Sequence, residues 1–289
     1  MNNSKVIGID LGATNIRGAV VEQGLLSDIV SQPIKSDGSV EDVLNDIYTV
    51  IDTMLQAGEV KAIGIGVPSI VDVTEGIVYD VQYIPSWKEV HLKRMLQERY
   101  QLPVYVNNDA NCFAVGEYHY GKGIGTGSMI GLTIGTGLGA GVIINGQLYP
   151  GFNCGAGEFG FLPYLDNILE YYCSGSFFKN VYKEDGVKIF QDAQKGDGYA
   201  LRLFRELGKH IGHAIKMVMY TYDPELIVIG GSVRHAFPFF ATSVQHEIKT
   251  FAYQKSAERI RIEASNLNNS GILGAAALYN DANYKPGYL

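Results

Sequence analysis

The sequence predicts an α/β protein built from two related halves of β-β-…-α-β type. Residues 7–25 (IGIDLGATNIRGAVVEQGL) and 130–148 (IGLTIGTGLGAGVIINGQL) each read as an apolar strand, a glycine-containing turn and a second apolar strand. A weaker similarity joins residues 62–66 to 226–230, which are short β-rich runs ending in glycine. Both pairs occur in the same order along the chain, and this order favours two related halves over chance matches.

Composition limits the classes of partner. The chain has 289 residues, 46% of them hydrophobic, which is enough for a sizeable core. Its net charge is −7 and no run of Lys and Arg occurs, so we expect neither nucleic acid nor a membrane surface as a partner. No apolar run is long enough to cross a bilayer. Three widely spaced cysteines (Cys112, Cys154 and Cys173) argue against a disulfide framework and favour the reducing cytoplasm.

Helices are expected between the strands. Apolar residues from Val40 to Leu55 follow a one-face helical period, with Ser39 as a plausible N-cap and Gly58 as a stop. Residues 199–222 predict a long helix that ends before an Asp-Pro pair. Residues 271–279 (GILGAAALY) predict a short helix of small residues that packs closely against a neighbour.

The first glycine-containing turn carries groups suited to phosphate. Gly12 lets a phosphate approach backbone N–H groups, while Thr14 and Asn15 add side-chain donors. Arg17 adds a positive charge if it points inward. Asp10, at the strand end, is a candidate to hold Mg²⁺ through water, because Mg²⁺ is usually bound by few carboxylates together with water and phosphate oxygens.

The second turn, residues 133–141, offers the same devices through Thr133, Gly135, Thr136 and Gly137. It is not a Walker loop, because no Gly-Lys-Ser/Thr follows. It is not a dinucleotide fingerprint either, because the glycines lead into a strand and an Asn-Gly hairpin turn rather than into a helix. A lone turn of this kind is as well explained as a tight hairpin, but two similar turns favour phosphate binding.

Asp109 stands where a strand, residues 104–108, meets a predicted helix. Ligands of open α/β sheets tend to bind beyond the carboxyl ends of the strands. One interpretation is that Asp109 only caps the helix, a common use of aspartate. The other is that it accepts the proton of an attacking hydroxyl as a general base.

Five segments together resemble the ROK family, which groups bacterial sugar kinases with sugar-responsive repressors. They are residues 8–14 (GIDLGAT), 64–68 (GIGVP), 108–111 (NDAN), 135–141 (GTGLGAG) and 223–231, which begin with Asp-Pro and end with IVIGG. The resemblance covers nearly the whole chain. It implies an α/β, actin-like (ribonuclease H-like) ATPase fold with two similar βββαβα-type domains around a cleft where sugar and ATP meet. The expected domains are residues 1–114 plus 276–289, and residues 115–275.

The resemblance also implies the chemistry. It implies transfer of the γ-phosphate of ATP, with Mg²⁺, to a hexose hydroxyl, usually the 6-OH, and a cytoplasmic homodimer. By this resemblance Asp109 is the catalytic base. The expected sugar-binding residues are Asn108, Glu158, Glu170, Pro68 and Ser69, and the expected ATP-binding residues are Asp10, Gly12, Thr14, Asn15, Arg17, Thr133, Gly135, Thr136, Gly137, Gly230 and Gly231.

One departure from the family pattern concerns zinc. Gly157 to Gly160 match the family's Gly-Glu-x-Gly, but Phe161 replaces the histidine that usually follows, and the zinc cysteines are missing. We therefore expect no zinc site and a changed sugar preference. For Glu158 we favour a sugar contact over a loop-stabilising role, and for Glu170 both roles are open. His210 and His213, three residues apart, are expected on a solvated helix face rather than on a metal.

Two other functions remain as alternatives. A sugar-responsive regulator of the same family would carry a helix-turn-helix before the first strand. Here the first strand starts near Lys5, so we expect no such helix-turn-helix in this sequence. A catalytically silent sugar-binding protein is suggested by the missing histidine and zinc loop, whereas Asp109 and both phosphate turns argue against it. The sequence does not name the sugar.

Overall fold

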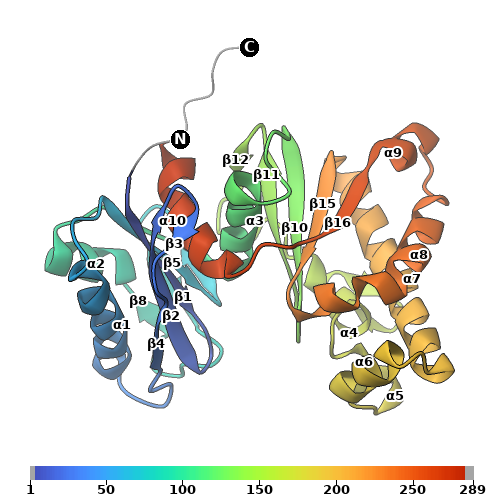
Figure 1. Cartoon of the computed structure of the whole chain (residues 1–289), viewed down its shortest axis with the longest axis horizontal. Helices are drawn as coiled ribbons and strands as arrows, with labels where there is room; N and C mark the ends of the chain where they lie inside the picture. The colour runs from blue at the N-terminus through green and yellow to red at the C-terminus, as the bar shows by residue number, and fades with distance from the viewer. Residues whose placement is uncertain (1–3, 284–289) are drawn as a thin grey trace. The chain divides into compact units, whose positions relative to one another are not determined.

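The computed structural model of the chain describes residues 4–283. These residues form two compact units, each with its own sheet and helices (Figure 1). The first unit contains residues 4–125, 141–156 and 267–283, and the second contains residues 126–140 and 157–266. The expected domain boundaries after residues 114 and 275 stay a prediction, and residues 1–3 and 284–289 of the expected first domain lie outside the described residues.

A mixed sheet forms the centre of the first unit. Its strand order is β3-β2-β1-β5-β9, and β4 also pairs with β2. Strand β1 is antiparallel to β2 but parallel to β5, which is parallel to β9. The carboxyl ends of β1, β5 and β9 therefore share one edge of the sheet. The strands are β1 (Val6–Leu11), β2 (Asn15–Glu22), β3 (Leu25–Leu26), β4 (Val30–Pro33), β5 (Ala62–Val67) and β9 (Val104–Asn108).

Helices cover both faces of this sheet. On one face α1 (Val40–Leu55) and α2 (Leu92–Tyr100) pack into a cluster of buried apolar side chains. The predicted Ser39 cap of α1 is confirmed, because its hydroxyl accepts a hydrogen bond from the Asp42 N–H at 3.2 Å and Asp42 bonds back to the Ser39 N–H at 2.9 Å. A small sheet, β6-β7-β8, adjoins this side; its strands are Ile70–Asp72, Ile77–Tyr79 and Glu89–Val90.

The other face carries α3 (Asp109–Tyr120) and α10 (Ser270–Ala282), which pack on each other. Helix α10 also packs on β1 and β5, and α3 packs on β5 and β9. Glycines let α10 come close to the sheet. A Cβ placed on Gly8 would lie 2.1 Å from the Ile272 carbonyl oxygen, and one on Gly64 would lie 1.8 Å from that of Ala275. The prediction of a closely packed helix of small residues is confirmed.

The sheet of the second unit runs β11-β10-β15-β16. Its strands are β10 (Ser128–Ile134), β11 (Leu138–Ile144), β15 (Leu226–Gly230) and β16 (Arg261–Ala264). Strand β15 is parallel to both β10 and β16. The far end of β11, in the first unit, turns back into β12 (Gln147–Leu148) through Asn145 and Gly146, whose φ angles of 52° and 77° confirm the predicted hairpin turn.

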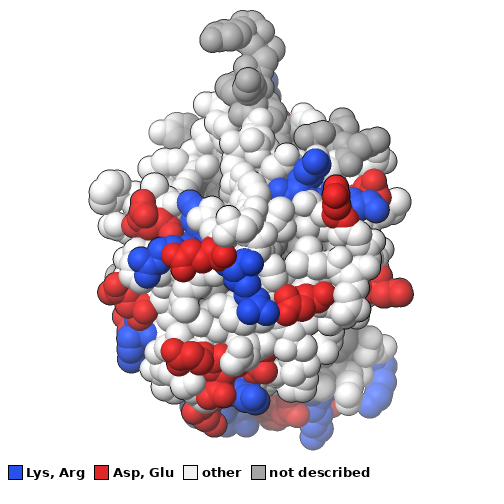
Figure 2. Space-filling model, turned by 90° about the vertical axis from the view of Figure 1, so that its left-hand side faces the viewer, with Lys and Arg blue, Asp and Glu red and all other residues white. Residues whose placement is uncertain are grey.

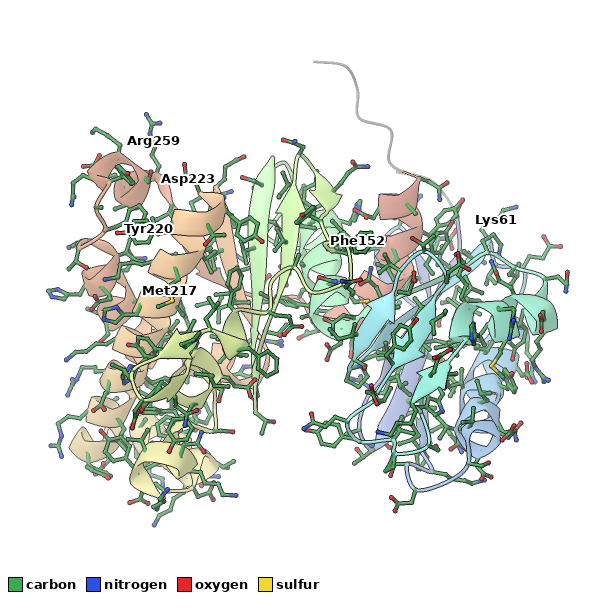
Figure 3. All side chains as sticks on the ribbon, turned by 180° about the vertical axis from the view of Figure 1, so that it is seen from behind. Lys61, Phe152, Met217, Tyr220, Asp223 and Arg259 are labelled. Atoms are coloured by element: carbon green, nitrogen blue, oxygen red, sulfur yellow. The ribbon has the colours of Figure 1, made fainter. Side chains whose placement is uncertain are left out.

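The longest helix of the second unit is α7 (Gly198–Tyr222), which packs on α8 (Phe237–Ile248). It ends as predicted: Asp223 takes a left-handed φ of 41°, and its N–H bonds to the Met219 carbonyl at 3.1 Å. Figure 3 labels Met217, Tyr220 and Asp223 along this final stretch. The remaining helices are α4 (Leu169–Cys173), α5 (Phe177–Tyr182), α6 (Gly186–Gln194), α9 (Gln254–Arg259) and the short 3₁₀ turns Phe159–Phe161 and Ser232–Ala236.

Two surface properties bear on possible partners. On the face of the first unit that Figure 2 shows, basic and acidic side chains are interspersed, so this face offers no continuous basic stripe for a polyanion. Within residues 4–283, no helix combines the length and the apolarity that crossing a membrane requires.

Candidate active site

The junction of β9 and α3 holds Asp109. The helix cap is Asn108, whose Oδ1 accepts hydrogen bonds from the N–H groups of Ala110 at 2.9 Å and Asn111 at 3.4 Å. The interpretation of Asp109 as the N-cap is therefore wrong, because Asp109 is the first residue of the helix itself. Its carboxylate is exposed, and its Oδ1 also accepts from the Ala110 N–H at 2.8 Å. Backbone dipoles at a helix start favour the ionised form of a carboxylate placed there.

Asn108 links this junction to the next strand. Its Nδ2 donates to the Ser69 carbonyl at 3.2 Å, and strand register pairs Asn108 with Val67, one residue before Pro68. The same register pairs Asp10 with Gly66. The structure therefore brings the predicted sugar-side residues of the first unit and Asp10 to one edge of the sheet.

A buried network of polar side chains stabilises the junction of β9 and α3. The side-chain oxygen of Asn107 accepts from the Asn108 N–H at 2.9 Å, from Asn111 Nδ2 at 2.9 Å and from the Cys154 thiol at 3.5 Å. Asn107 and Asn111 are 6% and 1% exposed. Because buried polar groups are costly when unpaired, this network fixes the turn from strand to helix that presents Asp109.

The first glycine turn is closed by a hydrogen bond from the Gly12 N–H to the Asn15 carbonyl at 3.0 Å. Thr14 and Asn15 are exposed at its tip, and Asn15 Nδ2 donates to Thr14 Oγ1 at 3.0 Å. Arg17 donates from its Nη2 to Asn269 Oδ1 at 2.6 Å, which ties β2 to the start of α10. The turn therefore presents polar donors to solvent, as a phosphate-binding turn requires.

Asp10 lies against the first turn of α10. A Cβ on Gly271 would be 2.8 Å from the Asp10 Cγ, so only glycine leaves room beside this carboxyl. Burial raises the pKa of Asp10 above its usual value, and the Arg17 charge offsets part of that rise. A partly desolvated carboxylate gains stability from a bound cation. Asp10 therefore fits Mg²⁺ held through water; within residues 4–283 no three His, Cys, Asp or Glu side chains form a metal-binding group.

In the second unit the glycine turn from Gly135 to Gly137 is held from three sides. The Gly175 N–H donates to the Gly135 carbonyl at 2.7 Å, and Ser176 Oγ donates to the Thr136 carbonyl at 2.7 Å. Glu170 Oε2 accepts from the Leu138 N–H at 2.9 Å. Glu170 thus has a loop-stabilising contact, one of the two roles left open by the sequence.

Glu158 lies at the start of the Phe159–Phe161 turn, in the same unit as Glu170. Its residue surface is solvent-accessible, yet partial burial of the carboxyl raises its pKa, and the Glu170 charge raises it further. A carboxylate accepts hydrogen bonds from hydroxyl groups, so Glu158 is suited to contact a hydroxyl-bearing ligand.

Strands β10 and β15 place two further predicted segments side by side. Their register pairs Thr133 with Gly230. Gly231 takes a φ of 72°, and a Cβ there would lie 2.3 Å from the Ile134 carbonyl oxygen. Only glycine permits this close approach, so the second glycine turn and the Gly230-Gly231 pair form one backbone surface.

This surface opens into a pocket of about 770 Å³ within the second unit. Gly135 and Thr136 are among its lining residues, and most of its lining surface is apolar. The aromatic wall residues are Phe178, Phe190 and Phe204, joined by Val187, Val233 and Ala236, with Lys179, Lys183 and His235 also lining the pocket. The volume lies in the range of small-molecule and cofactor sites. These residues were not predicted from the sequence, because they come from separate elements: α5, α6, α7 and the Ser232–Ala236 turn. The only sequence signal that they carry is the apolar period of each helix.

The segment that replaces the family's zinc loop is a short hairpin of β13 (Pro163–Tyr164) and β14 (Asn167–Ile168), which leads directly into α4 and Glu170. The Tyr164 hydroxyl lies 3.0 Å from His210 Nδ1 on α7. The His210 ring also packs against Tyr172 and Phe177. The expected solvated position of His210 is therefore wrong, because aromatic packing and a hydrogen bond hold the hairpin on α7.

The predicted site residues thus fall into two groups. The first unit gathers Asp10, Gly12, Thr14, Asn15, Arg17, Pro68, Ser69, Asn108 and Asp109, and the second gathers Thr133, Gly135, Thr136, Gly137, Glu158, Glu170, Gly230 and Gly231. Each unit combines a parallel β core, a glycine turn after its first long strand, and helices. The fold is the actin-like ATPase fold, shared with structures of ROK sugar kinases.

A sequence model of the ROK family matches residues 6–282, and the chain belongs to this family. It is 28% identical to a glucokinase of Thermotoga maritima, covering 96% of this chain and 98% of that protein. It is 26% identical to the xylose repressor of Bacillus subtilis, covering 95% of this chain and 77% of that protein. Among solved structures, a ROK family glucokinase from Streptomyces griseus in complex with glucose and AMPPNP superposes with a TM-score of 0.79 at 27% identity, covering 95% of this chain and 98% of that one.

Proposed function

We propose that this protein is an ATP-dependent sugar kinase that transfers the γ-phosphate of ATP to a hexose hydroxyl, the 6-OH. The observation that carries the proposal is the glycine turn at Gly135–Gly137 opening into an apolar pocket of about 770 Å³. The glycine turn and its Thr136 hydroxyl suit phosphates, and the aromatic wall suits a purine ring. The solved glucokinase relative with bound glucose and AMPPNP supports the same ligand pair.

In the proposed reaction Asp109 accepts the proton of the attacking sugar hydroxyl. The hydroxyl oxygen forms a bond to the γ-phosphorus while the bond between that phosphorus and the β,γ-bridging oxygen breaks, and ADP leaves. The exposed Asp109 carboxylate, held by the Asn108 cap and the Asn107 network, is suited to receive that proton. Glycine turns of both units, with Thr14 and Thr136, hold phosphates.

We assign sugar contacts to the turn after β5, Pro68 and Ser69, and to Asn108 and Glu158. The Glu158 carboxylate can accept a hydrogen bond from a sugar hydroxyl. Asn108 contributes mainly by position, since both ends of its amide are already hydrogen-bonded. Glu170 acts on the phosphate turn through Leu138. The homodimer implied by the family stays a prediction.

Asp10 would hold Mg²⁺ through water. The ion, when bound, would neutralise charge on the triphosphate. The chain's own contribution is a single half-buried carboxylate, and burial raises its pKa because its charge loses solvation. Arg17, which is hydrogen-bonded to Asn269, supplies a positive charge near this carboxylate, and Gly271 leaves the space that the carboxylate occupies.

A coupled ADP-release assay over a sugar panel tests the proposal. The panel should hold glucose, mannose, allose, fructose, an N-acetylated hexosamine and a phosphorylated or β-linked glucoside. We expect turnover on at least one sugar, and a fall of about 10²–10⁴-fold in Asp109→Asn with sugar affinity nearly unchanged. The position of the new phosphate on the best substrate checks the 6-OH assignment.

Two results would count against the kinase. Silence on every sugar, with sugar still bound, would support a catalytically silent binding protein. Sequence-specific DNA binding released by sugar would support a regulator, the activity that the xylose repressor relatives are named for.

A further inference from the structure

The pocket beside the second glycine turn is apolar wherever its lining is buried. The buried lining residues are Phe178, Phe204, Val233 and Ala236. The rings of Phe178 and Phe204 are in contact with a centroid distance of 4.9 Å, and Phe190 packs on Phe204 at 6.4 Å. Among the described residues that line the pocket, no polar side chain is buried. The buried part of the wall therefore offers a ligand apolar contact rather than hydrogen bonds.

Most polar side chains of this pocket are in contact with solvent. The exposed ones are Thr136, Lys179, Lys183, Asp185, Ser232 and His235. Water competes for the hydrogen bonds of an exposed group, so the net gain from a ligand contact there is small. These side chains therefore distinguish poorly between two ligands that differ by one donor or one acceptor.

Two polar side chains of the lining, Ser176 and Glu184, are half-buried. The Ser176 hydroxyl already donates its proton to the Thr136 carbonyl at 2.7 Å. The Glu184 carboxylate is only an acceptor. Adenine can donate to it from its 6-amino group, guanine from N1 and its 2-amino group, and hypoxanthine from N1. Glu184 can therefore serve each of these purines and selects none.

The backbone of the lining is also largely engaged within the chain. The Gly175 N–H donates to the Gly135 carbonyl at 2.7 Å, and the Glu184 N–H donates to the Phe178 carbonyl at 3.0 Å. The Val187 N–H donates to Asp185 Oδ1 at 2.9 Å. These three donors are not available to select the edge of a base.

From these contacts we infer that the protein accepts purine nucleoside triphosphates in general as phosphoryl donors, not ATP alone. This rests on the kinase function proposed above, because it concerns the base of the same nucleotide. A site built to hydrogen-bond one group of a ligand rejects analogues that lack the group by about 10⁴-fold or more, whereas an apolar pocket rejects related ligands only weakly. Contact between bases and aromatic side chains tolerates different bases, since every base has a flat π face. Guanine and hypoxanthine should therefore be accepted as adenine is.

Calorimetric titration with ADP, GDP and IDP, in the presence of Mg²⁺ and without sugar, tests the tolerance. We expect the three Kd values to lie within about tenfold of one another, the difference expected without base-specific hydrogen bonds. Inorganic pyrophosphate carries the same two phosphates without a base, and should bind about tenfold or more weakly than ADP because it leaves the apolar wall uncovered. In turnover on the best sugar, the kcat/KM values for ATP, GTP and ITP should show the same narrow spread.

A variant of the wall and a matched control test where the base lies. Phe190→Ala removes a half-buried ring of the lining, and should weaken ADP, GDP and IDP by one common factor of about tenfold. Phe239→Ala is the control, because this half-buried ring packs on Phe190 at 6.1 Å and on Phe204 at 5.6 Å but does not line the pocket. It should leave the three affinities within about twofold of the wild type.

Thermal unfolding of each variant verifies that it is folded. Val187→Ser provides the same test if Phe190→Ala is unstable, because Val187 lines the pocket but is 65% exposed. Its control is Val181→Ser, at an exposed valine outside the lining. Val187→Ser should cause a smaller loss that is again common to the three diphosphates, whereas Val181→Ser should cause none.

Three results would overturn the inference. One is a preference for ADP, or for any one of the three, larger than about tenfold. Another is pyrophosphate that binds as tightly as ADP, because the base would then lie outside the pocket. The third is a loss in Phe190→Ala that differs between the bases.

The kinase proposal fails on different results. Equal binding of the three diphosphates without turnover on any sugar would reject the kinase and retain a nucleotide pocket that tolerates all three bases. Turnover with ATP alone would reject the general phosphoryl donor and retain the kinase.

Discussion

The carboxylate of Glu170 accepts a hydrogen bond from the Leu138 N–H at 2.9 Å, and so joins α4 to the second glycine turn. The contact depends on a neighbouring glycine, because a Cβ on Gly137 would stand 2.6 Å from the same carboxylate oxygen. The hairpin that replaces the family's zinc loop leads straight into α4 and is fastened to α7 by Tyr164 and His210. Packing and hydrogen bonds thus position the second glycine turn from this side.

Glu170→Ala should therefore weaken nucleotide binding more than sugar binding. It leaves the Leu138 N–H without its charged partner, and a hydrogen bond to a charged group is worth about 1.5–3 kcal/mol. We expect the KM for ATP to rise about tenfold or more, with the KM for the sugar within about twofold. Glu170→Gln keeps an acceptor at this place and should recover most of the loss. A selective rise in the KM for sugar would instead support the sugar-contact role.

Gly271→Ala should damage catalysis without damaging the fold. The new methyl would lie 2.8 Å from the Asp10 Cγ, so the carboxylate must move by a substantial fraction of an ångström. Displacements of about 1 Å at a reacting centre cost about 100-fold, and we expect a kcat loss approaching that size with the KM for sugar unchanged. Gly198→Ala is the matched control, because it also lies in the first turn of a helix and no atom lies within 4 Å of its Cβ position. Equal kcat in the two variants would remove Asp10 from the mechanism.

Much of the fold follows from local signals in the sequence. The apolar period from Val40 to Leu55, the Ser39 cap and the Asn145-Gly146 turn each involve residues close in sequence, so their structure was predictable. The placement of Asp109 at a helix start was predictable for the same reason. The identity of the capping residue was not predictable. Asn and Asp are equally good caps, and the two candidates, Asn108 and Asp109, are neighbours in the sequence.

The tertiary contacts of the site could not be predicted in this way. Glu170 and Leu138 are 32 residues apart, and Tyr164 and His210 are 46 apart. Such pairs depend on how α4 and α7 pack in the folded protein. This packing produces no periodic pattern in the sequence from which the pairs could be predicted. The aromatic pocket is likewise assembled from several helices, each of which shows only an ordinary apolar face.

Asp10→Asn should stabilise the protein without ligands and abolish turnover. Because the pKa of Asp10 is raised in the folded chain, the folded state binds its proton more tightly than the unfolded state. This extra stability of the folded state is present below pH 3.8, the pKa of Asp10 in the unfolded chain, and is lost as the pH rises through the folded pKa. Ionised Asp10 therefore weakens the fold near pH 7. Asparagine removes that cost, and we expect the Tm at pH 7 to rise by about 2–4 °C if the cost is near 1 kcal/mol.

The matched control is Asp37→Asn, on an exposed turn, which should leave the Tm unchanged. A lower Tm for Asp10→Asn would show that Arg17 outweighs burial.

His119 should make the first unit sensitive to acid. Burial lowers the pKa of its imidazole from 6.5 to about 4, so the unfolded chain binds the proton more tightly than the folded chain. The stability that this gives is complete above pH 6.5 and is lost as the pH falls towards 4. The shift corresponds to roughly 3 kcal/mol at its limit.

Urea unfolding of the wild type should show a free energy of unfolding that falls as the pH is lowered from 6.5 towards 4. His119→Leu should flatten the fall, whereas His246→Gln, at an exposed position of the second unit, should retain the wild-type slope. Parallel slopes for wild type and His119→Leu would mean that this imidazole is already solvated in the folded chain.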